Sequence, residues 1–207
     1  MTKAEFKNKL SIWQNRAFSW SQITSFDYSP EQWFNKYFLG EEQFETEELR
    51  FGKIIGERLA SDPKFLPEVP RLSKFEHGFK VMFGKIKLVG YADSFCEKSK
   101  KVLYEYKTGV KKWDQKRVDE HGQIDMYLLM NYITNKIRPE EMQVKLVWLP
   151  TKRKEDGDFK VTIDFVDGMK PQVFSTKRTM QDILNFGARI NRVHKEMQAY
   201  AELQCNI

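Results

Sequence analysis

The stretch VLYEYKTG, residues 102–109, has the composition of a buried β-strand interrupted by two charges. Val102, Leu103 and Tyr104 are core-type residues, whereas Glu105 and Lys107 break the apolar run two positions apart. Because residues two apart in a strand project from the same face, this strand places a carboxylate beside an ammonium. Charges inside an otherwise apolar strand are usually paired or bind a metal, so this pair is the first candidate for a functional site.

A β-hairpin is predicted just upstream, over residues 75–83 and 86–98 with a turn at 84–85. Its second strand contains Asp93, within VGYADSF, twelve residues before Glu105 and separated from it by a short polar turn. Antiparallel neighbours joined by so short a turn lie close in space. We therefore expect Asp93, Glu105 and Lys107 to converge at one end of a sheet.

This convergence points to a metal centre. Two adjacent carboxylates repel unless a cation lies between them, and hard oxygen ligands suit Mg²⁺ or Mn²⁺. Lys107 would then orient a water or help to deprotonate it, which suits metal-assisted attack on a phosphodiester. The alternative is a cross-strand ion pair on an exposed sheet face. The apolar residues around both Asp93 and Glu105 favour the metal.

The order of predicted elements indicates one domain of the α/β or α+β class. A helical, aromatic-rich N-terminal region and a helix near residues 45–62 precede the three strands, and a helix follows within 114–136. Two more strands (143–150 and 158–168), separated by a turn tip at 151–158, and a long helix starting near 175–176 complete the chain. This predicts a central mixed sheet flanked by helices. We divide residues 1–207 into an N-terminal part (1–44), a core (45–150), and a strand with the C-terminal helix (151–207).

Composition excludes several classes of protein. The 207 residues are 41% hydrophobic, which is enough for a substantial core, and the net charge of +6 suits a polyanionic partner without requiring one. The two cysteines, Cys96 and Cys205, fit no disulfide framework or metal cluster. No apolar run would span a bilayer and no secretion signal is seen, so we expect no membrane association and a cytoplasmic location, the host cytoplasm if the protein is viral.

GYAD followed by EYK resembles the motif of the PD-(D/E)XK nuclease superfamily. The tail EYKTG is similar to the DYKTG of its RecB-like branch, which includes AddB-type nucleases and CRISPR-associated RecB-like exonucleases. That branch carries a Gln and a Tyr four apart on the next helix, matched by Gln123 and Tyr127, which would share a helix face. The resemblance covers roughly residues 45–150 and implies a restriction-endonuclease-like core of order αβββαβ.

The resemblance also implies roles for individual residues. Asp93 and Glu105 would hold Mg²⁺ or Mn²⁺ together with the backbone carbonyl of Tyr106. Lys107 would act on the attacking water, and Gln123 and Tyr127 would support the site, so that the expected catalytic residues are Asp93, Glu105, Lys107, Gln123 and Tyr127.

The chain departs from the branch in two places. The first core helix lacks the metal-binding His of many relatives, which leaves Glu57 as the candidate ligand, or as a solvated helix residue. The iron–sulfur cluster of some relatives cannot be built from two cysteines, and Ser29-Pro30 stands where one cluster Cys would be.

A run of basic residues follows the motif strand. Beside a phosphodiester site these side chains would bind DNA phosphates, although such a run is equally typical of a solvated face. Trp113 would either stack on a base or anchor the loop. The run consists of Lys111, Lys112, Lys116 and Arg117.

The sequence therefore predicts a metal-dependent deoxyribonuclease, with an exonuclease activity in DNA processing, recombination or repair. Its substrate would be single- or double-stranded DNA. Two alternatives stay open: a nucleic-acid-binding module of the same fold that does not cut, and a structure-specific endonuclease.

Overall fold

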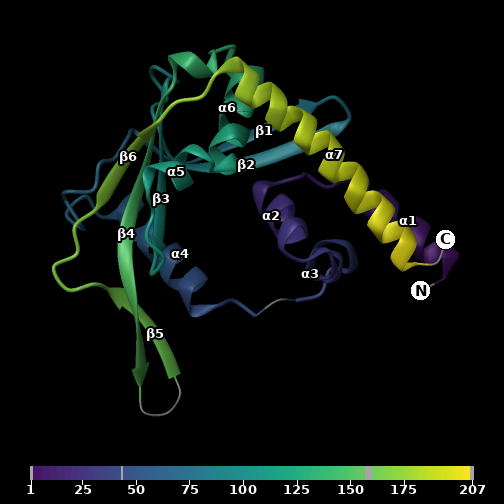
Figure 1. Cartoon of the computed structure of the whole chain (residues 1–207), viewed down its shortest axis with the longest axis horizontal. Helices are drawn as coiled ribbons and strands as arrows, with labels where there is room; N and C mark the ends of the chain where they lie inside the picture. The colour runs from purple at the N-terminus through teal and green to yellow at the C-terminus, as the bar shows by residue number, and fades with distance from the viewer. Residues whose placement is uncertain (1, 43, 157–159, 206–207) are drawn as a thin grey trace.

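The computed structural model describes residues 2–42, 44–156 and 160–205 (Figure 1). The helices are α1 (Lys3–Asn15), α2 (Trp20–Tyr28), α3 (Pro30–Trp33), the π-helical η1 (Phe34–Leu39), α4 (Glu47–Ser61), α5 (Gln115–Asp119), α6 (Gly122–Asn135), the 3-10 turn η2 (Pro139–Glu141) and α7 (Met180–Gln204). The strands are β1 (Lys74–Phe83), β2 (Ile86–Phe95), β3 (Val102–Gly109), β4 (Gln143–Asp156), β5 (Lys160–Phe165) and β6 (Gln172–Thr176).

These strands form one mixed sheet of six strands in the order β1-β2-β3-β4-β5, with β6 also paired to β4. β3 and β4 are parallel, and every other neighbouring pair is antiparallel. Helix α6 supplies the crossover that a parallel pair requires. The predicted class, a central mixed sheet flanked by helices with a helical N-terminal region and a long C-terminal helix, is confirmed.

The sheet is split between β2 and β3. These two strands pair only where Ser94 and Phe95 meet Tyr104 and Leu103, and beyond that point they separate. The free edge of β2 is taken up by the N-terminal region instead, because the Phe18 amide donates to the Lys87 carbonyl (2.7 Å) and the Val89 amide donates to the Phe18 carbonyl (3.0 Å). We call the space between β2 residues 86–93 and β3 residues 105–109 the fork, and its closed end the apex.

The two faces of the sheet carry different helices. One face packs against α6, α7 and the N-terminal helices, and contributes Leu88 and Leu103 to the main core. On the other face α4 packs Ile55 and Leu59 against β4. Gly52 sets the approach of α4 to β3, because a Cβ atom at this position would lie 3.1 Å from Thr108 Oγ1. The side chains of Glu105 and Lys107 share the face of Leu103, since all three alternate with Tyr104 and Tyr106.

Helix α7 is long but amphipathic. Its buried residues form a stripe that includes Ile183, Phe186, Ile190, Val193 and Met197, while the remaining positions are largely polar. Within the described ranges, no helix is both long enough and apolar enough to cross a lipid bilayer.

Two boundaries differ from the sequence prediction. Residues 151–156 continue β4 rather than forming a turn tip, because they pair with β5; positions 157–158 of that tip lie outside the described residues. The C-terminal helix begins at Met180, capped by the Thr179 side chain, and residues 172–176 form β6. Ser29 caps α3 ahead of Pro30, since its hydroxyl accepts from the Gln32 amide at 3.2 Å.

Candidate active site

Asp93, Glu105 and Lys107 meet at the apex of the fork. The β2–β3 register places Asp93 opposite Glu105, one step beyond the last paired residues. The Tyr106 amide donates to Asp93 Oδ2 at 2.7 Å, and Lys107 Nζ donates to Glu105 Oε1 at 2.6 Å. The Glu105 side chain is only 1% exposed, whereas that of Lys107 is 26% exposed. The structure thus brings together the three charges that the sequence predicted to converge.

Burial and mutual repulsion dominate the electrostatics of the two carboxyl groups. Burial raises the pKa of Asp93 well above its ordinary value, and the charge of Glu105 raises it further. For Lys107, burial disfavours the charged form, but the carboxylates of Glu105 and Asp93 outweigh it and raise the pKa. The apex therefore holds a fixed ammonium beside the Glu105 side chain and an Asp93 carboxyl whose ionisation is disfavoured.

Gln123 and Tyr127 hold Lys107 from α6. Lys107 Nζ donates to Gln123 Oε1 at 2.8 Å, Gln123 Nε2 donates to Tyr127 Oη at 2.6 Å, and Tyr127 Oη donates to the Tyr91 carbonyl at 2.5 Å. Burial, reinforced by the nearby carboxylates, raises the pKa of Tyr127 well above its ordinary value, so its phenol stays a donor. This chain of hydrogen bonds ties β3, α6 and β2 together across the fork.

Gly90 makes room for this chain. A Cβ atom at Gly90 would lie 3.0 Å from Tyr127 Cε1 and 2.6 Å from Met130 Cε. A glycine at this position of β2 lets the Tyr127 ring pack directly on the strand.

The donor set at the apex fits a hard divalent cation. Among the residues that the structure describes, Glu105 Oε2 is buried without a hydrogen-bond partner, although a buried carboxylate oxygen normally has one. A cation shared with Asp93 would satisfy this oxygen and remove the repulsion that raises the Asp93 pKa. Within the described part of the chain, no three His, Cys, Asp or Glu side chains are grouped closely enough to hold a metal ion. The site therefore offers a metal ion two carboxylates, a backbone oxygen and water as ligands.

The expected third carboxylate, Glu57, lies apart from this pair. Its side chain is exposed on α4, and it does not line the small cavity of about 380 Å³ that contains Asp93. From α4, that cavity is lined by Gly52 and Gly56 among others.

Glu76, which no sequence pattern indicates, lines the same small cavity as Asp93. The β1–β2 register puts Glu76 opposite Asp93, between the pairs Phe75–Ser94 and His77–Ala92. Its φ of 48° is left-handed, a conformation that costs a non-glycine residue about 1–2 kcal/mol. No residue type or spacing in KFEHGF signals this conformation.

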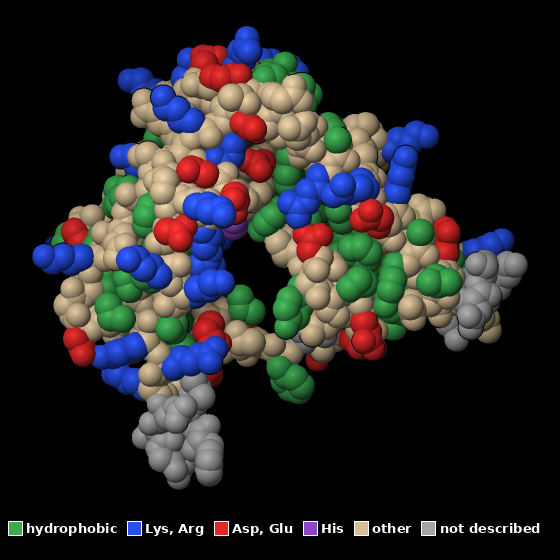
Figure 2. Space-filling view, in the orientation of Figure 1, with side chains coloured by type: hydrophobic (Ala, Val, Ile, Leu, Met, Phe, Trp, Pro, Cys, Tyr) green, Lys and Arg blue, Asp and Glu red, His purple; other side chains and the backbone are tan. Residues whose placement is uncertain are grey.

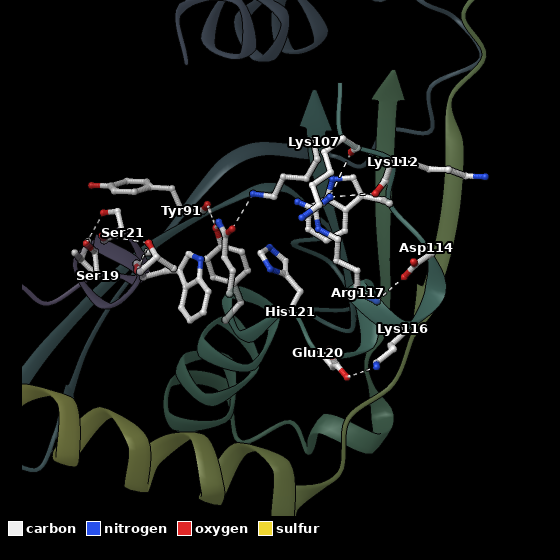
Figure 3. Close-up of a pocket in the computed structure, with 18 residues that line it drawn as sticks. Ser19, Ser21, Tyr91, Lys107, Lys112, Asp114, Lys116, Arg117, Glu120 and His121 are labelled. Atoms are coloured by element: carbon white, nitrogen blue, oxygen red, sulfur yellow. Dashed lines mark hydrogen bonds and ion pairs between the residues drawn. The ribbon is translucent and has the colours of Figure 1, made fainter. Parts of the chain in front are cut away.

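A large cavity of about 1200 Å³ opens from the apex into the mouth of the fork. Its walls are the start of α2 on one side and the 110–117 segment on the other, and Lys107 lines both this cavity and the small one (Figure 3). Lys and Arg side chains gather along one side of the central hollow of the molecule (Figure 2). Lys111, Lys112 and Lys116 are exposed in this segment.

Arg117 and Trp113 stabilise the loop that carries them. The Arg117 guanidinium stacks on the Trp113 ring at 3.8 Å and donates to the carbonyls of Lys111 and Lys112 at 3.3 and 3.2 Å. Trp113 is only 6% exposed, so its ring anchors the loop and offers no face to a base. Of the four expected phosphate-binding residues, Arg117 is thus engaged with protein, whereas Lys111 and Lys112 make no hydrogen bond through their ammonium groups within the described residues.

His121 connects the two walls of the large cavity. Its ring lies edge-on to Trp20 of α2 (5.9 Å between centroids) and to Trp113 of the loop (5.0 Å). Burial lowers the pKa of His121 to about 3, helped by the charge of Lys107. The imidazole is therefore neutral at physiological pH and acts as a packing element between the walls.

No protein-family model matches the chain, and neither does any curated protein. Among solved structures, a candidate exonuclease from Eubacterium rectale is similar to 97% of this chain over 87% of its own, with a TM-score of 0.52 and 9% sequence identity. The structure of SSO0001 is similar over 98% of this chain and 88% of its own, at 13% identity, but its TM-score of 0.46 is too low to support an inference. The chain therefore shares the mixed α/β fold of the candidate exonuclease.

Proposed function

We propose that this chain is a Mg²⁺- or Mn²⁺-dependent nuclease that hydrolyses phosphodiester bonds in DNA. The observation that carries the proposal is the apex of the fork, where a buried carboxylate oxygen without a partner lies beside a second carboxyl group and a fixed ammonium. Structural ion pairs seldom leave such an oxygen unsatisfied, whereas a metal site needs it.

Asp93, Glu105 and the Tyr106 carbonyl would hold the metal. When bound, the metal would polarise the phosphoryl group and lower the pKa of the attacking water. It would also offset the burial and the repulsion that raise the pKa of Asp93, so that this carboxyl stays ionised at neutral pH. Glu76, which lines the same small cavity as Asp93, is a further carboxylate that could reach the site from β1.

Lys107 is suited to act in the transition state. Two of its three N–H donors are directed to Glu105 and Gln123, which leaves one for the attacking water or for a phosphoryl oxygen. Gln123 and Tyr127 are positioning residues, since they fix the direction of that remaining donor. A fixed charge of this kind stabilises the negative charge that develops on the phosphoryl oxygens.

An exonuclease is the form of the activity that we favour, with a role in DNA processing, recombination or repair. Support comes from the motif resemblance and from the fold shared with the candidate exonuclease. A structure-specific endonuclease and a non-cutting binding module have the same fold and are distinguished by assay.

The test is a cleavage assay with end-labelled linear DNA, single- and double-stranded, and with circular single-stranded DNA. We expect cleavage of linear DNA with Mg²⁺ or Mn²⁺ and none with EDTA. Asp93→Asn should abolish it, whereas Asp167→Asn, which changes a carboxylate that is 95% exposed, should not. Cleavage of the circular strand would identify an endonuclease, and binding without cleavage under either metal would identify the binding module.

A further inference from the structure

The candidate active site opens onto both faces of the sheet. Beyond the apex β2 and β3 are no longer paired, so the fork is a gap in the sheet. The large cavity lies on the face covered by α6, because Gln123 and Tyr127 line it. The small cavity lies on the face covered by α4. Lys107 lines both cavities, so they meet at the candidate site.

The small cavity has the size and the wall chemistry of a site for one small ligand. Its volume is about 380 Å³, at the low end of the roughly 300–1,000 Å³ that is usual for small-molecule sites. Leu49 and Phe75 give it an apolar wall, and Lys53 adds a positive charge. Asp93 and Lys107 line the same cavity, so a ligand bound there lies directly beside the residues proposed to cut the phosphodiester.

Lys53 is available to an anionic group in this cavity. Its side chain is exposed on α4, and the ion pairs of this helix engage other residues. Arg50 pairs with Glu47, and Arg153 pairs with Glu48 at 2.6 Å. Among the residues that the structure describes, Lys53 therefore has no carboxylate partner, whereas the charge of Glu48 on the same wall is neutralised. A free ammonium beside an apolar wall suits a ligand that carries a phosphate and a base.

Gly56 leaves space in the same cavity. A glycine inside a helix is less stable than an alanine, so its presence needs a reason. At Gly52 the reason is close packing, because a Cβ atom there would lie 3.1 Å from Thr108 Oγ1. At Gly56 a Cβ atom would meet nothing within 4 Å, so packing does not require a glycine. Since Gly56 lines the small cavity, the missing side chain keeps that cavity open.

Resting on the function proposed above, we infer that the small cavity binds the nucleotide that is cut from the strand, so that each turnover releases one nucleoside monophosphate. The rest of the strand lies in the large cavity, with the scissile phosphodiester at Lys107 between the two. Water supplies a hydroxyl group to the phosphorus and a proton to the sugar oxygen of the broken P–O bond. The strand becomes one nucleotide shorter because the small cavity holds a single small ligand.

Calorimetry with thymidine 5′-monophosphate in Mg²⁺ tests the site without cleavage, because this ligand contains no phosphodiester. Wild type should bind it, Lys53→Ala should weaken binding about 5-fold, and Lys53→Arg should restore it. Thymidine, which lacks the phosphate, should bind equally to wild type and Lys53→Ala. Gly56→Leu should weaken binding of the monophosphate roughly 10- to 100-fold, because its side chain occupies the space of the ligand. The matched control is Ala60→Leu, which adds the same side chain at an exposed position of α4 that does not line the cavity.

Mass spectrometry of the first products from a linear single strand completes the test. Wild type and Ala60→Leu should release mononucleotides, and Gly56→Leu should release them more slowly. First products of two or more nucleotides, or equal binding of the monophosphate by wild type and Gly56→Leu, would overturn the inference and leave the nuclease activity standing. Binding of the monophosphate that depends on Lys53 and Gly56, without any cleavage of DNA, would retain the nucleotide site and refute the proposed activity.

Discussion

Side chains from two elements, its own strand β3 and helix α6, hold the ammonium group of Lys107. Glu105 reaches it along β3 and Gln123 reaches it from α6, so its ammonium is confined on two sides. A side chain confined in this way loses little further entropy when the transition state forms. The contacts of this single residue therefore fix the direction of the one Lys107 N–H bond that stays available to substrate.

Asp93 gives the first prediction. Its pKa in the folded protein is raised above the ordinary value of 3.8, so between about pH 4 and the raised value the folded state binds more protons than the unfolded state. Stability from this group is then lost as pH rises through that window. Metal-free Asp93→Asn should accordingly be more stable than wild type at pH 7, and the gap should close toward pH 4.

Urea unfolding in EDTA at several pH values measures this difference. Metal should reverse the order: at about 100 times its dissociation constant it should add roughly 2.7 kcal/mol to wild type and little to the variant. A variant that is no more stable than wild type at pH 7 without metal would contradict the repulsion between Asp93 and Glu105.

The main site residues could be predicted from sequence because each contact is local in the chain. Glu105 and Lys107 are two apart in a strand, and Gln123 and Tyr127 are four apart in a helix. Glu76 could not be predicted, because its left-handed backbone depends on how β1 fits against β2. Glu57 was expected from a relative's pattern, but the face of α4 that lines the cavity is set by Gly52 and Gly56 instead.

At the scale of elements, glycines fix how the helices meet the site. A Cβ atom at Gly122, the first residue of α6, would lie 2.7 Å from the Trp20 ring of α2. Gly122→Ala should therefore force the α2 wall outward and destabilise the protein by about 1–3 kcal/mol. Gly56→Ala is the matched control, because a Cβ atom there meets nothing within 4 Å and lies inside α4.

The control should gain about 0.5–1 kcal/mol from the lower backbone entropy of its unfolded chain. Chemical denaturation of both variants measures the two changes. If Gly122→Ala stabilised the protein as Gly56→Ala is expected to do, Trp20 would not pack tightly on α6.

The elements that could not be predicted from the sequence are those that depend on strands distant in the chain. QVFST forms β6 because it pairs with β4; its Val, Phe and Thr favour a strand, but five residues are too few to show the alternation that marks one. The charged continuation of β4 over 151–156 is likewise a strand because β5 pairs with it. By contrast, the helical period of α6 and the short turn between β2 and β3 are local signals.

Across the whole molecule, some lysines are paired with carboxylates and others are not. Lys152 and Lys154 on the β4–β5 hairpin are paired with Asp167 and Asp164 at 2.6 and 2.5 Å. Lys111 and Lys112, by contrast, line the large cavity. Lys111 and Lys112 would therefore attract DNA toward the cavity.

The combined variant Lys111→Ala, Lys112→Ala, Lys116→Ala tests this distribution. It should bind single-stranded DNA more weakly and reduce the log–log slope of affinity against salt by roughly 0.7 for each lost phosphate contact. Lys152→Ala, Lys154→Ala should leave the slope unchanged. Equal slopes for wild type and the triple variant would assign the three lysines to a solvated face. Arg117 is left intact because its loss would loosen the loop.

The single-turnover cleavage rate of Lys107→Ala measures whether the apex of the fork cleaves phosphodiesters. Because Lys107 would act mainly in the transition state, the variant should lose about 10²- to 10³-fold in rate while its metal affinity by calorimetry and its DNA affinity stay near wild type. Lys80→Ala, an exposed lysine on β1, should cleave at the wild-type rate. Cleavage by Lys107→Ala at the wild-type rate would reduce the Glu105–Lys107 pair to a structural salt bridge and contradict the account.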